Sequence, residues 1–258
     1  MSRCTAIALV LCPSLMLVIG CGPNDAPTGP GFGPGDDTVT FEAPWPEDLA
    51  ATLTTVFTDG AGDQEALPPE MAGPPYSGPV PYPAVDVTEI LLGADAEFMY
   101  MRVQFASTIP SAAVHVSEAG EIEEQWVRNQ GMNVALNSDG DIDTGGGGEG
   151  VSGIDIFFAV GFEYGQKTSV YANWDFPDGD LHNQMNHMLG EVGEGGVGHD
   201  FVLVRYDISQ LGAFFPRGAT VDVGSWSEAE SFNQDGSLKY HHFAFDRVID
   251  GGQWGIPE

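Results

Sequence analysis

The sequence has few of the residues that thiol chemistry or nucleic-acid binding would require. Cysteine occurs only at Cys4, Cys12 and Cys21. A disulfide framework, a thiolate zinc site and a cysteine nucleophile are therefore excluded beyond Cys21, where the fold must depend on its hydrophobic core. Lysine and arginine number 8 against 38 aspartates and glutamates, which gives a formal net charge of −30. Such a charge repels nucleic acid and attracts cations, so no nucleic-acid partner is expected.

The common signatures of catalysis are also missing. The chain contains no G-x-S-x-G nucleophile motif, no P-loop lysine and no G-x-G-x-x-G after an expected strand. A glycosidase can be built from two carboxylates, but nothing in the sequence selects one pair among 38 acidic residues. The sequence therefore favours a role other than catalysis, and a metal- or carboxylate-dependent hydrolase is kept as an alternative.

The first residues have the order of an export signal. Residues 1–20 contain a positive charge at Arg3, then an apolar run, then small residues. The run is shorter than the roughly 20 residues that a membrane-spanning helix needs. The sequence VIGC, which ends at Cys21, resembles the lipobox of bacterial lipoproteins. This resemblance implies cleavage before Cys21, lipidation of Cys21 and an anchor in a lipid membrane; an ordinary secretory signal is the alternative. Gly22 resembles the lipoprotein class sorted to the outer membrane, so we expect a location in the cell envelope.

The remainder divides into two parts. Residues 21–37 are rich in glycine and proline and have no apolar period, which is typical of a flexible tether. Residues 38–258 show no repeat and no second low-complexity break, so we expect one domain.

This domain has the pattern of an all-β protein. In the run 97–106, Met99, Met101, Val103 and Phe105 alternate with a more polar set, which is the period of a half-buried strand. Similar runs are expected as strands at 84–93, 132–136, 153–165, 168–174, 200–208, 220–226 and 239–246. No sustained helical stripe separates them. The sequence therefore predicts an antiparallel two-sheet β-sandwich of jelly-roll type.

The order of several short motifs resembles that of bacterial CBM9-like or DOMON-like sandwiches. The motifs are FTDGAGDQ, VDVTEILLGADAEFMYMRVQF, LNSDGDIDTGG and FVLVRYDISQLG, and together they span most of residues 57–226. The resemblance implies a binding sandwich, for sugars in some members and haem in others, often with structural calcium. The chain departs from the pattern at Gly145–Gly148, where an asparagine-rich continuation is usual.

Closely spaced aspartates suggest a calcium site. Asp139, Asp141 and Asp143 have the spacing of the first three ligands of an EF-hand loop. The match then fails, because Thr144 replaces the turn glycine and Gly150 the bidentate glutamate. A looser Ca²⁺ site and a plain solvated turn both remain open for this loop. The resemblance adds three acids that could complete the site: Asp59, Asp63 and Asp86.

The region 173–200 is the predicted ligand-binding segment, because it is long for a connection within a sandwich. It combines an aromatic ring with amide and imidazole groups, the mixture that sugar recognition needs. The candidate residues are Trp174, His182, Asn183, Gln184, Asn186 and His187. Core packing is the alternative for Trp174. His241 and His242 are adjacent on an expected strand, so we expect their side chains to point to opposite faces.

Taken together, these observations predict an exported, lipid-anchored, acidic β-sandwich that acts as a surface binding module. Carbohydrate is the expected ligand class, and calcium is expected in a structural role. The alternative from another class is a structural or protein-interaction lipoprotein of the cell envelope.

Overall fold

The computed structural model describes residues 38–66, 73, 78–79, 82–116, 125–148, 151–164, 167–176, 179 and 185–258. The predicted leader, Cys21 and the tether lie outside the described residues. Among the helices of the described part, none has the length and apolar character needed to cross a membrane.

Two antiparallel sheets make up most of the described chain. The smaller sheet has the order β1-β4-β5-β14-β13, and its strands are β1 (Thr54–Thr58), β4 (Val87–Ala94), β5 (Phe98–Phe105), β13 (Glu191–Gly195) and β14 (Phe201–Asp207). The larger sheet has the order β12-β11-β10-β7-β15-β16-β2-β3, with β6 also paired to β7. Its strands are β2 (Glu65–Ala66), β3 (Gly78–Pro79), β6 (Val114–Val116), β7 (Gln125–Asn137), β10 (Ile156–Glu163), β11 (Lys167–Trp174), β12 (Asn186–Leu189), β15 (Thr220–Asn233) and β16 (Leu238–Gly255).

The remaining elements are short. A separate hairpin joins β8 (Gly146–Gly148) to β9 (Val151–Ile154). The helical elements of the described residues are α1 (Leu49–Thr52) and two 3-10 turns, η3 (Ile208–Gln210) and η4 (Gly212–Phe214).

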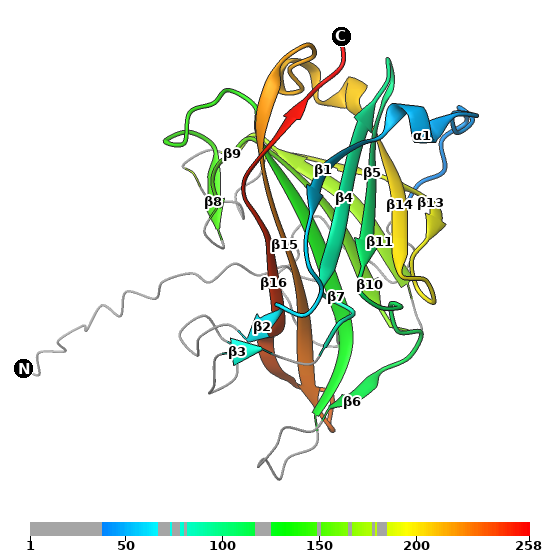
Figure 1. Ribbon diagram of the computed structural model, residues 1–258, viewed down its shortest axis with the longest axis vertical. Helices are drawn as coiled ribbons and strands as arrows, with labels where there is room; N and C mark the ends of the chain where they lie inside the picture. Colours follow the sequence, from blue (N-terminus) through cyan, green and yellow to red (C-terminus); the bar gives the residue numbers. More distant parts are fainter. Residues whose placement is uncertain are drawn as a thin grey trace, which may run out of the picture.

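The two sheets pack face to face as a sandwich, which confirms the predicted fold class (Figure 1). Strand β5 shows why the sequence folds this way. Met99, Met101, Val103 and Phe105 point into the core between the sheets and are at most 2% exposed. Burying a side chain of this size contributes about 1.5–3 kcal/mol, so the alternation fixes which face of the strand is inside.

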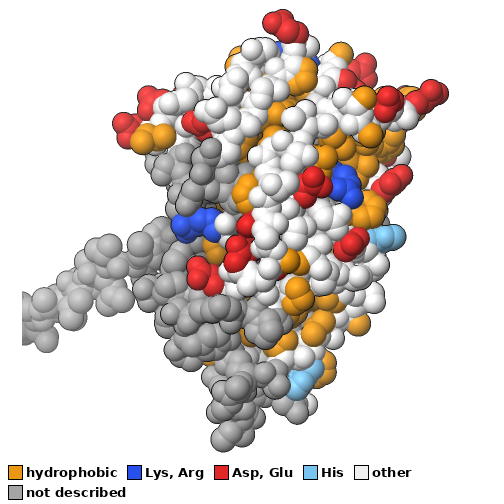
Figure 2. All heavy atoms as spheres, viewed as in Figure 1, with side chains coloured by type: hydrophobic (Ala, Val, Ile, Leu, Met, Phe, Trp, Pro, Cys, Tyr) orange, Lys and Arg blue, Asp and Glu red, His pale blue; other side chains and the backbone are white. Residues whose placement is uncertain are grey.

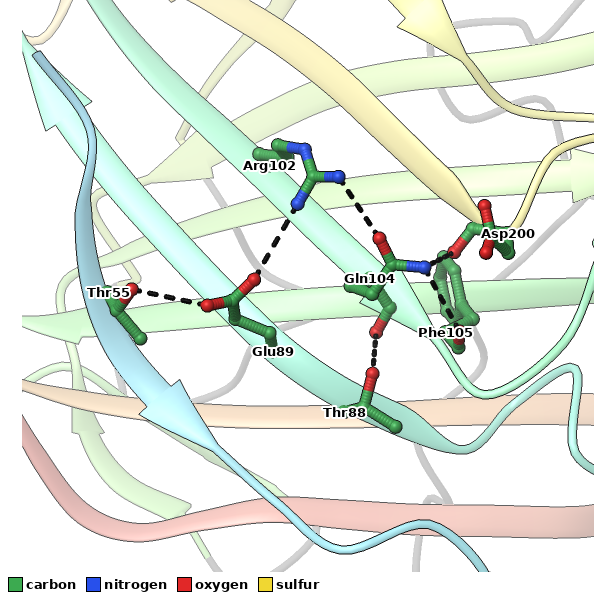
Figure 3. Close-up of polar contacts among 7 residues, drawn as sticks. All are labelled: Thr55, Thr88, Glu89, Arg102, Gln104, Phe105 and Asp200. Atoms are coloured by element: carbon green, nitrogen blue, oxygen red, sulfur yellow. Dashed lines mark hydrogen bonds and ion pairs between the residues drawn. The ribbon is translucent and has the colours of Figure 1, made fainter. Parts of the chain in front are cut away.

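The other face of β5 carries an exposed polar network across the smaller sheet (Figure 3). Arg102 Nη1 lies 3.7 Å from Glu89 Oε2 on β4, and Arg102 Nη2 donates to Gln104 Oε1 at 3.0 Å. Gln104 Nε2 in turn donates to the carbonyl of Asp200 at 2.7 Å. These contacts connect neighbouring strands on the solvent side, where such pairs contribute about 0–1 kcal/mol each.

The turn between β4 and β5 is held by one carboxylate. Asp95 Oδ1 accepts hydrogen bonds from the amides of Glu97 and Phe98, both at 2.8 Å, and Oδ2 accepts one from the Tyr100 hydroxyl at 2.6 Å. Burial alone raises the pKa of Asp95, but these hydrogen bonds and the nearby Arg217 hold it below its ordinary value.

A buried arginine attaches the N-terminal segment to the smaller sheet. Arg205 of β14 is 1% exposed, and its Nε donates to Glu191 Oε2 at 2.7 Å. Its Nη2 donates to the carbonyl of Ala43 at 2.7 Å. The guanidinium also lies 4.6 Å from the ring centre of Trp45 and 4.5 Å from that of Phe98. The segment that precedes β1 is therefore fixed to the sheet by paired charge and aromatic contact.

The region 173–200, expected to be one long loop, contains two strands. Strand β12 extends the larger sheet and β13 extends the smaller one, with Gly190 between them. A Cβ at Gly190 would lie 2.5 Å from Val170 Cγ1 and 2.8 Å from the carbonyl oxygen of Arg205, so only glycine fits where the chain changes sheet. Both strands are short, with four and five residues, which gave the sequence pattern little alternation to display.

Candidate functional site

Carboxylates from four parts of the chain meet where the two sheets come together at one edge. Asp59 follows β1, Asp63 lies in the next turn, Asp86 precedes β4 and Asp246 belongs to β16. Strand β16 contacts both β1 and β4 here. One oxygen each from Asp59, Asp63 and Asp246 lie within 4.8 Å of one another, and among the described residues this is the single group of three or more acidic, histidine or cysteine ligands that close.

Backbone amides aim these side chains. Val87 N donates to Asp246 Oδ2 at 2.8 Å, which links the two sheets. Gly62 N donates to Asp86 Oδ2 at 2.6 Å, and Gly62 has a φ of +105°, a conformation that favours glycine. The turn after β1 therefore folds back over the buried carboxylate of Asp86.

Keeping these carboxylates ionised without a counterion costs folding free energy. Asp86 and Asp246 are 1% and 3% exposed. Burial, and after it the charges of Asp63, Asp86 and Asp59, raises the pKa of Asp246 to about 7 against the opposing hydrogen bond from Val87. Burial and the neighbouring carboxylates also raise the pKa values of Asp63 and Asp86.

One buried oxygen of this group has no protein partner. Asp86 Oδ1 is fully buried and accepts no hydrogen bond. A buried acceptor without a partner costs about 1–3 kcal/mol, and more when the group is charged. A hard divalent cation is the counterion that fits an all-oxygen site. Two oxygen ligands on opposite sides of a Ca²⁺ ion are about 4.8 Å apart, twice the usual Ca–O distance. The oxygens of Asp59, Asp63 and Asp246 lie within this separation. Oxygens from water or backbone would complete the six to eight ligands that calcium takes.

Sequence reasoning named three of these four acids. Asp59, Asp63 and Asp86 came from the family resemblance as possible partners of the Asp139 loop, whereas the structure places them with Asp246. No sequence pattern pointed to Asp246, which lies at the end of an aromatic run and 160 positions from Asp86. Only the antiparallel packing of β16 beside β1 and β4 brings it into the group.

The loop that holds Asp139, Asp141 and Asp143 does not join this group. Asp139 Oδ1 accepts a hydrogen bond from the amide of Asp141 at 2.8 Å, and Asp141 Oδ1 accepts one from the amide of Asp143 at 3.0 Å. Thr144 Oγ1 donates to Asp139 Oδ2 at 3.0 Å. All three aspartates are exposed. These local turns account for the aspartate spacing, so calcium at this loop stays a prediction.

The predicted ligand residues are spread over different environments. Trp174 packs in the core between the sheets and is 6% exposed, so core packing describes it. His187 is exposed at the end of the larger sheet, with Nδ1 2.7 Å from Asn173 Oδ1. Asn186 Nδ2 donates weakly to Asp175 Oδ2 at 3.5 Å. His182, Asn183 and Gln184 lie outside the described residues.

A β-bulge overturns the expectation for His241 and His242. Both imidazoles reach the same side of the larger sheet, with ring centres 6.1 Å apart. His241 Nδ1 lies 2.7 Å from Glu230 Oε1, and His242 Nδ1 lies 2.8 Å from Glu228 Oε2. The register of β15 with β16 shifts between Ala229 and Ser231, and this irregularity breaks the strict alternation of a regular strand.

The described surface is acidic, as the composition predicts. In the view of Figure 2, carboxylates are scattered over the described part of the surface, with few basic groups between them. The fold and the acidic group define an antiparallel β-sandwich with an oxygen-rich candidate cation site at its edge. No protein-family model, curated protein or solved structure matches the chain.

Proposed function

We propose that this protein is an exported binding module, anchored through lipid on Cys21 in the cell envelope, whose sandwich is stabilised by one calcium ion. The ligands are the carboxylates of Asp59, Asp63, Asp86 and Asp246. The observation that carries this proposal is the convergence of these acids around buried oxygens, one of which has no protein partner. Carbohydrate is the ligand class that we propose for the module.

Calcium would have a structural role at this position. Asp59 and Asp63 lie at the end of the smaller sheet, and Asp246 belongs to the larger one. An ion bound between them would neutralise three or four carboxylates and join the sheets at an edge that their mutual repulsion otherwise weakens. The binding free energy would therefore appear as folding stability.

The test is a thermal melt of the mature chain with Cys21 replaced by serine, in chelator and in calcium. With a dissociation constant of about 10⁻⁴ M, as in extracellular modules, about 10 mM Ca²⁺ adds roughly 2.7 kcal/mol. For a domain of this size the midpoint then rises by roughly 5–10 °C. Magnesium at the same concentration controls for charge screening.

Two variants locate the site. The change Asp86→Asn should remove most of the calcium-dependent rise, because it removes a buried ligand. The change Asp139→Asn is the matched control, since it removes the same charge from an exposed loop. A rise lost in Asp139→Asn and kept in Asp86→Asn would move the site to the loop, and no rise at all would refute the calcium proposal.

A further inference from the structure

The larger sheet has a second buried surface on the side away from the core. We call it the outer face and define it by the side chains that alternate with core residues on β7, β10, β11, β15 and β16, together with Ile154 of β9 and Phe176 after β11. Its apolar members form a cluster separate from the main core: Ala135, Ile154, Phe157, Ala159, Tyr171, Phe176, Trp226 and Phe245. The rings of Phe157 and Trp226 are 5.5 Å apart between centres. The larger sheet therefore buries apolar side chains on both of its faces, and its outer face is not simply a solvent-exposed surface.

The strand register places small residues at the centre of the outer face. Trp226 pairs with Asn133, Asn133 with Ala159, and Ala159 with Tyr171. In the next row, Glu228 pairs with Gly131, and Gly131 with Gly161. The two glycines and Ala159 leave the middle of the face without large side chains. Aromatic rings stand on either side of it along the first row.

Several polar atoms on this face are buried without a hydrogen-bond partner. Asn133 and Trp226 are each 1% exposed. Neither amide atom of Asn133 nor the Nε1 of Trp226 has a partner, and neither does Oδ1 of Asn129, four residues before Asn133 on β7. Each such group costs about 1–3 kcal/mol. Because buried polar groups are normally satisfied, a cluster of unsatisfied ones on neighbouring strands points to a missing partner molecule.

The chemistry of these atoms restricts the partner. The unpartnered Asn133 Nδ2 and Trp226 Nε1 are donors, and the unpartnered oxygens of Asn133 and Asn129 are acceptors. A ligand must therefore offer acceptors and donors side by side, as hydroxyl groups do. An anion would meet the carboxylates of Glu228 and Glu230, and a simple cation would leave both donors unsatisfied. The adjacent aromatic rings suit the C–H surface of a sugar ring.

We infer that the outer face binds an uncharged saccharide, with Asn133 and Trp226 in direct contact with its hydroxyl groups. This inference rests on the proposed function as a binding module and assigns the contacts with the ligand to Asn133 and Trp226 of the sheet, in place of the amide and imidazole residues predicted in the 173–200 segment. The assignment of this site holds whether or not the protein binds calcium. The His241–Glu230 and His242–Glu228 pairs flank the site and keep the two carboxylates oriented as hydroxyl acceptors.

The experiment measures binding of named sugars to the mature chain with Cys21 replaced by serine. The probes are glucose, galactose, mannose, xylose and their β-linked disaccharides, with glucuronate and glucosamine as charged controls. Binding is followed by tryptophan fluorescence and by the melting midpoint, in calcium and in chelator. The calcium effect without sugar tests the proposed calcium site separately, so failure of one proposal is distinguishable from failure of the other.

Three variants assign the site. Asn133→Leu removes the unpartnered amide at a similar side-chain size, and Trp226→Phe removes the unpartnered N–H and keeps an aromatic ring. We expect each to weaken binding of the neutral sugar about tenfold or more. Without sugar, Asn133→Leu should leave the midpoint unchanged or raise it, because no hydrogen bond is lost. The control Asn186→Ala, in the segment predicted from sequence and paired with the core residue Trp174, should bind as the parent does.

Four results would overturn the inference. They are no binding of any neutral sugar in the panel, equal binding of the charged sugars, binding that survives both Asn133→Leu and Trp226→Phe, and binding that is lost only in Asn186→Ala. If Asn133→Leu fails to fold, Trp226→Phe decides alone.

Discussion

Replacing Asp246 by asparagine should stabilise the calcium-free protein and reduce the stability that the protein gains from calcium. The side chain is 3% exposed and sits among Asp59, Asp63 and Asp86. Asparagine has nearly the same shape and can still accept the hydrogen bond from Val87 through its Oδ1. The substitution therefore removes one charge and one strong cation ligand and leaves the packing in place.

The magnitude follows from the raised pKa of Asp246, about 7 in the folded protein. An unfolded aspartate titrates at about 3.9, and each unit of difference corresponds to about 1.4 kcal/mol. At about pH 8 in chelator, the ionised side chain thus costs the fold up to about 4 kcal/mol, and Asp246→Asn should be more stable than the parent by roughly 2–4 kcal/mol. If the loss of this ligand weakens calcium binding tenfold, calcium stabilises the variant by about 1.4 kcal/mol less than it stabilises the parent.

The dependence on pH has a definite sign. Because the folded pKa of Asp246 lies above the unfolded one, the native state holds more protons between the two values. The calcium-free parent should therefore lose stability as pH rises from about 4 to about 7. The difference between Asp246→Asn and the parent isolates this contribution from those of the other carboxylates.

The assay is urea denaturation at fixed ionic strength, in chelator and in calcium, at several pH values. A variant that is less stable than the parent in chelator at about pH 8, yet gains as much from calcium, would refute both the electrostatic reasoning and the assignment of Asp246 as a ligand.

Three further predictions concern the described scaffold. Arg205→Met should cost about 3–5 kcal/mol in denaturant melts because it leaves Glu191 buried and unpaired, and adding Glu191→Gln should recover part of this loss; no recovery would argue against charge burial as the cause. Asp95→Asn should lower the free energy of unfolding by about 1 kcal/mol near neutral pH. Because the pKa of Asp95 is lowered in the folded protein, the stability that its carboxylate contributes is present above about pH 4 and is lost as pH falls through the folded pKa. The stability difference between variant and parent should therefore shrink in acid. Gly193→Ala should destabilise by about 1–3 kcal/mol, because a Cβ there would lie 2.6 Å from the ring of Trp45; an unchanged midpoint would mean that the ring moves freely.

The strands that the sequence predicted well are those whose burial alternates on one face. Strand β5 was expected at 97–106 and spans Phe98–Phe105, with its methionines inside as the period required. Strand β15 runs on to Asn233, well past its expected end at 226, because Glu228 and Glu230 point to the outer face while Ala229 fills the core. A strand that buries polar side chains on one face and apolar side chains on the other lacks the hydrophobic pattern by which a strand buried on both faces is predicted.

The candidate sites depend on contacts that no local pattern encodes. Asp246 reaches Asp59 through sheet packing, and the unpartnered amide of Asn133 is defined only by what surrounds it. The side chains of His241 and His242 lie on the same side of the larger sheet because a bulge shifts the register between β15 and β16, and no local sequence pattern predicts this bulge. Composition predicted an excess of carboxylates that could bind a cation, but which carboxylates lie together is determined by the topology.

Strand β16 connects the two proposed sites. Phe245 belongs to the apolar cluster of the outer face, and the next residue, Asp246, points to the opposite side among the carboxylates. Without a cation, repulsion among these carboxylates acts on the backbone that also positions Phe245. A bound cation would remove that repulsion and fix the strand, so the outer face should bind its sugar more tightly in calcium than in chelator. By linkage, the sugar must then raise the calcium affinity by the same factor. An identical sugar affinity in the two conditions would mean that the outer face is rigid without the ion and that the two sites act independently.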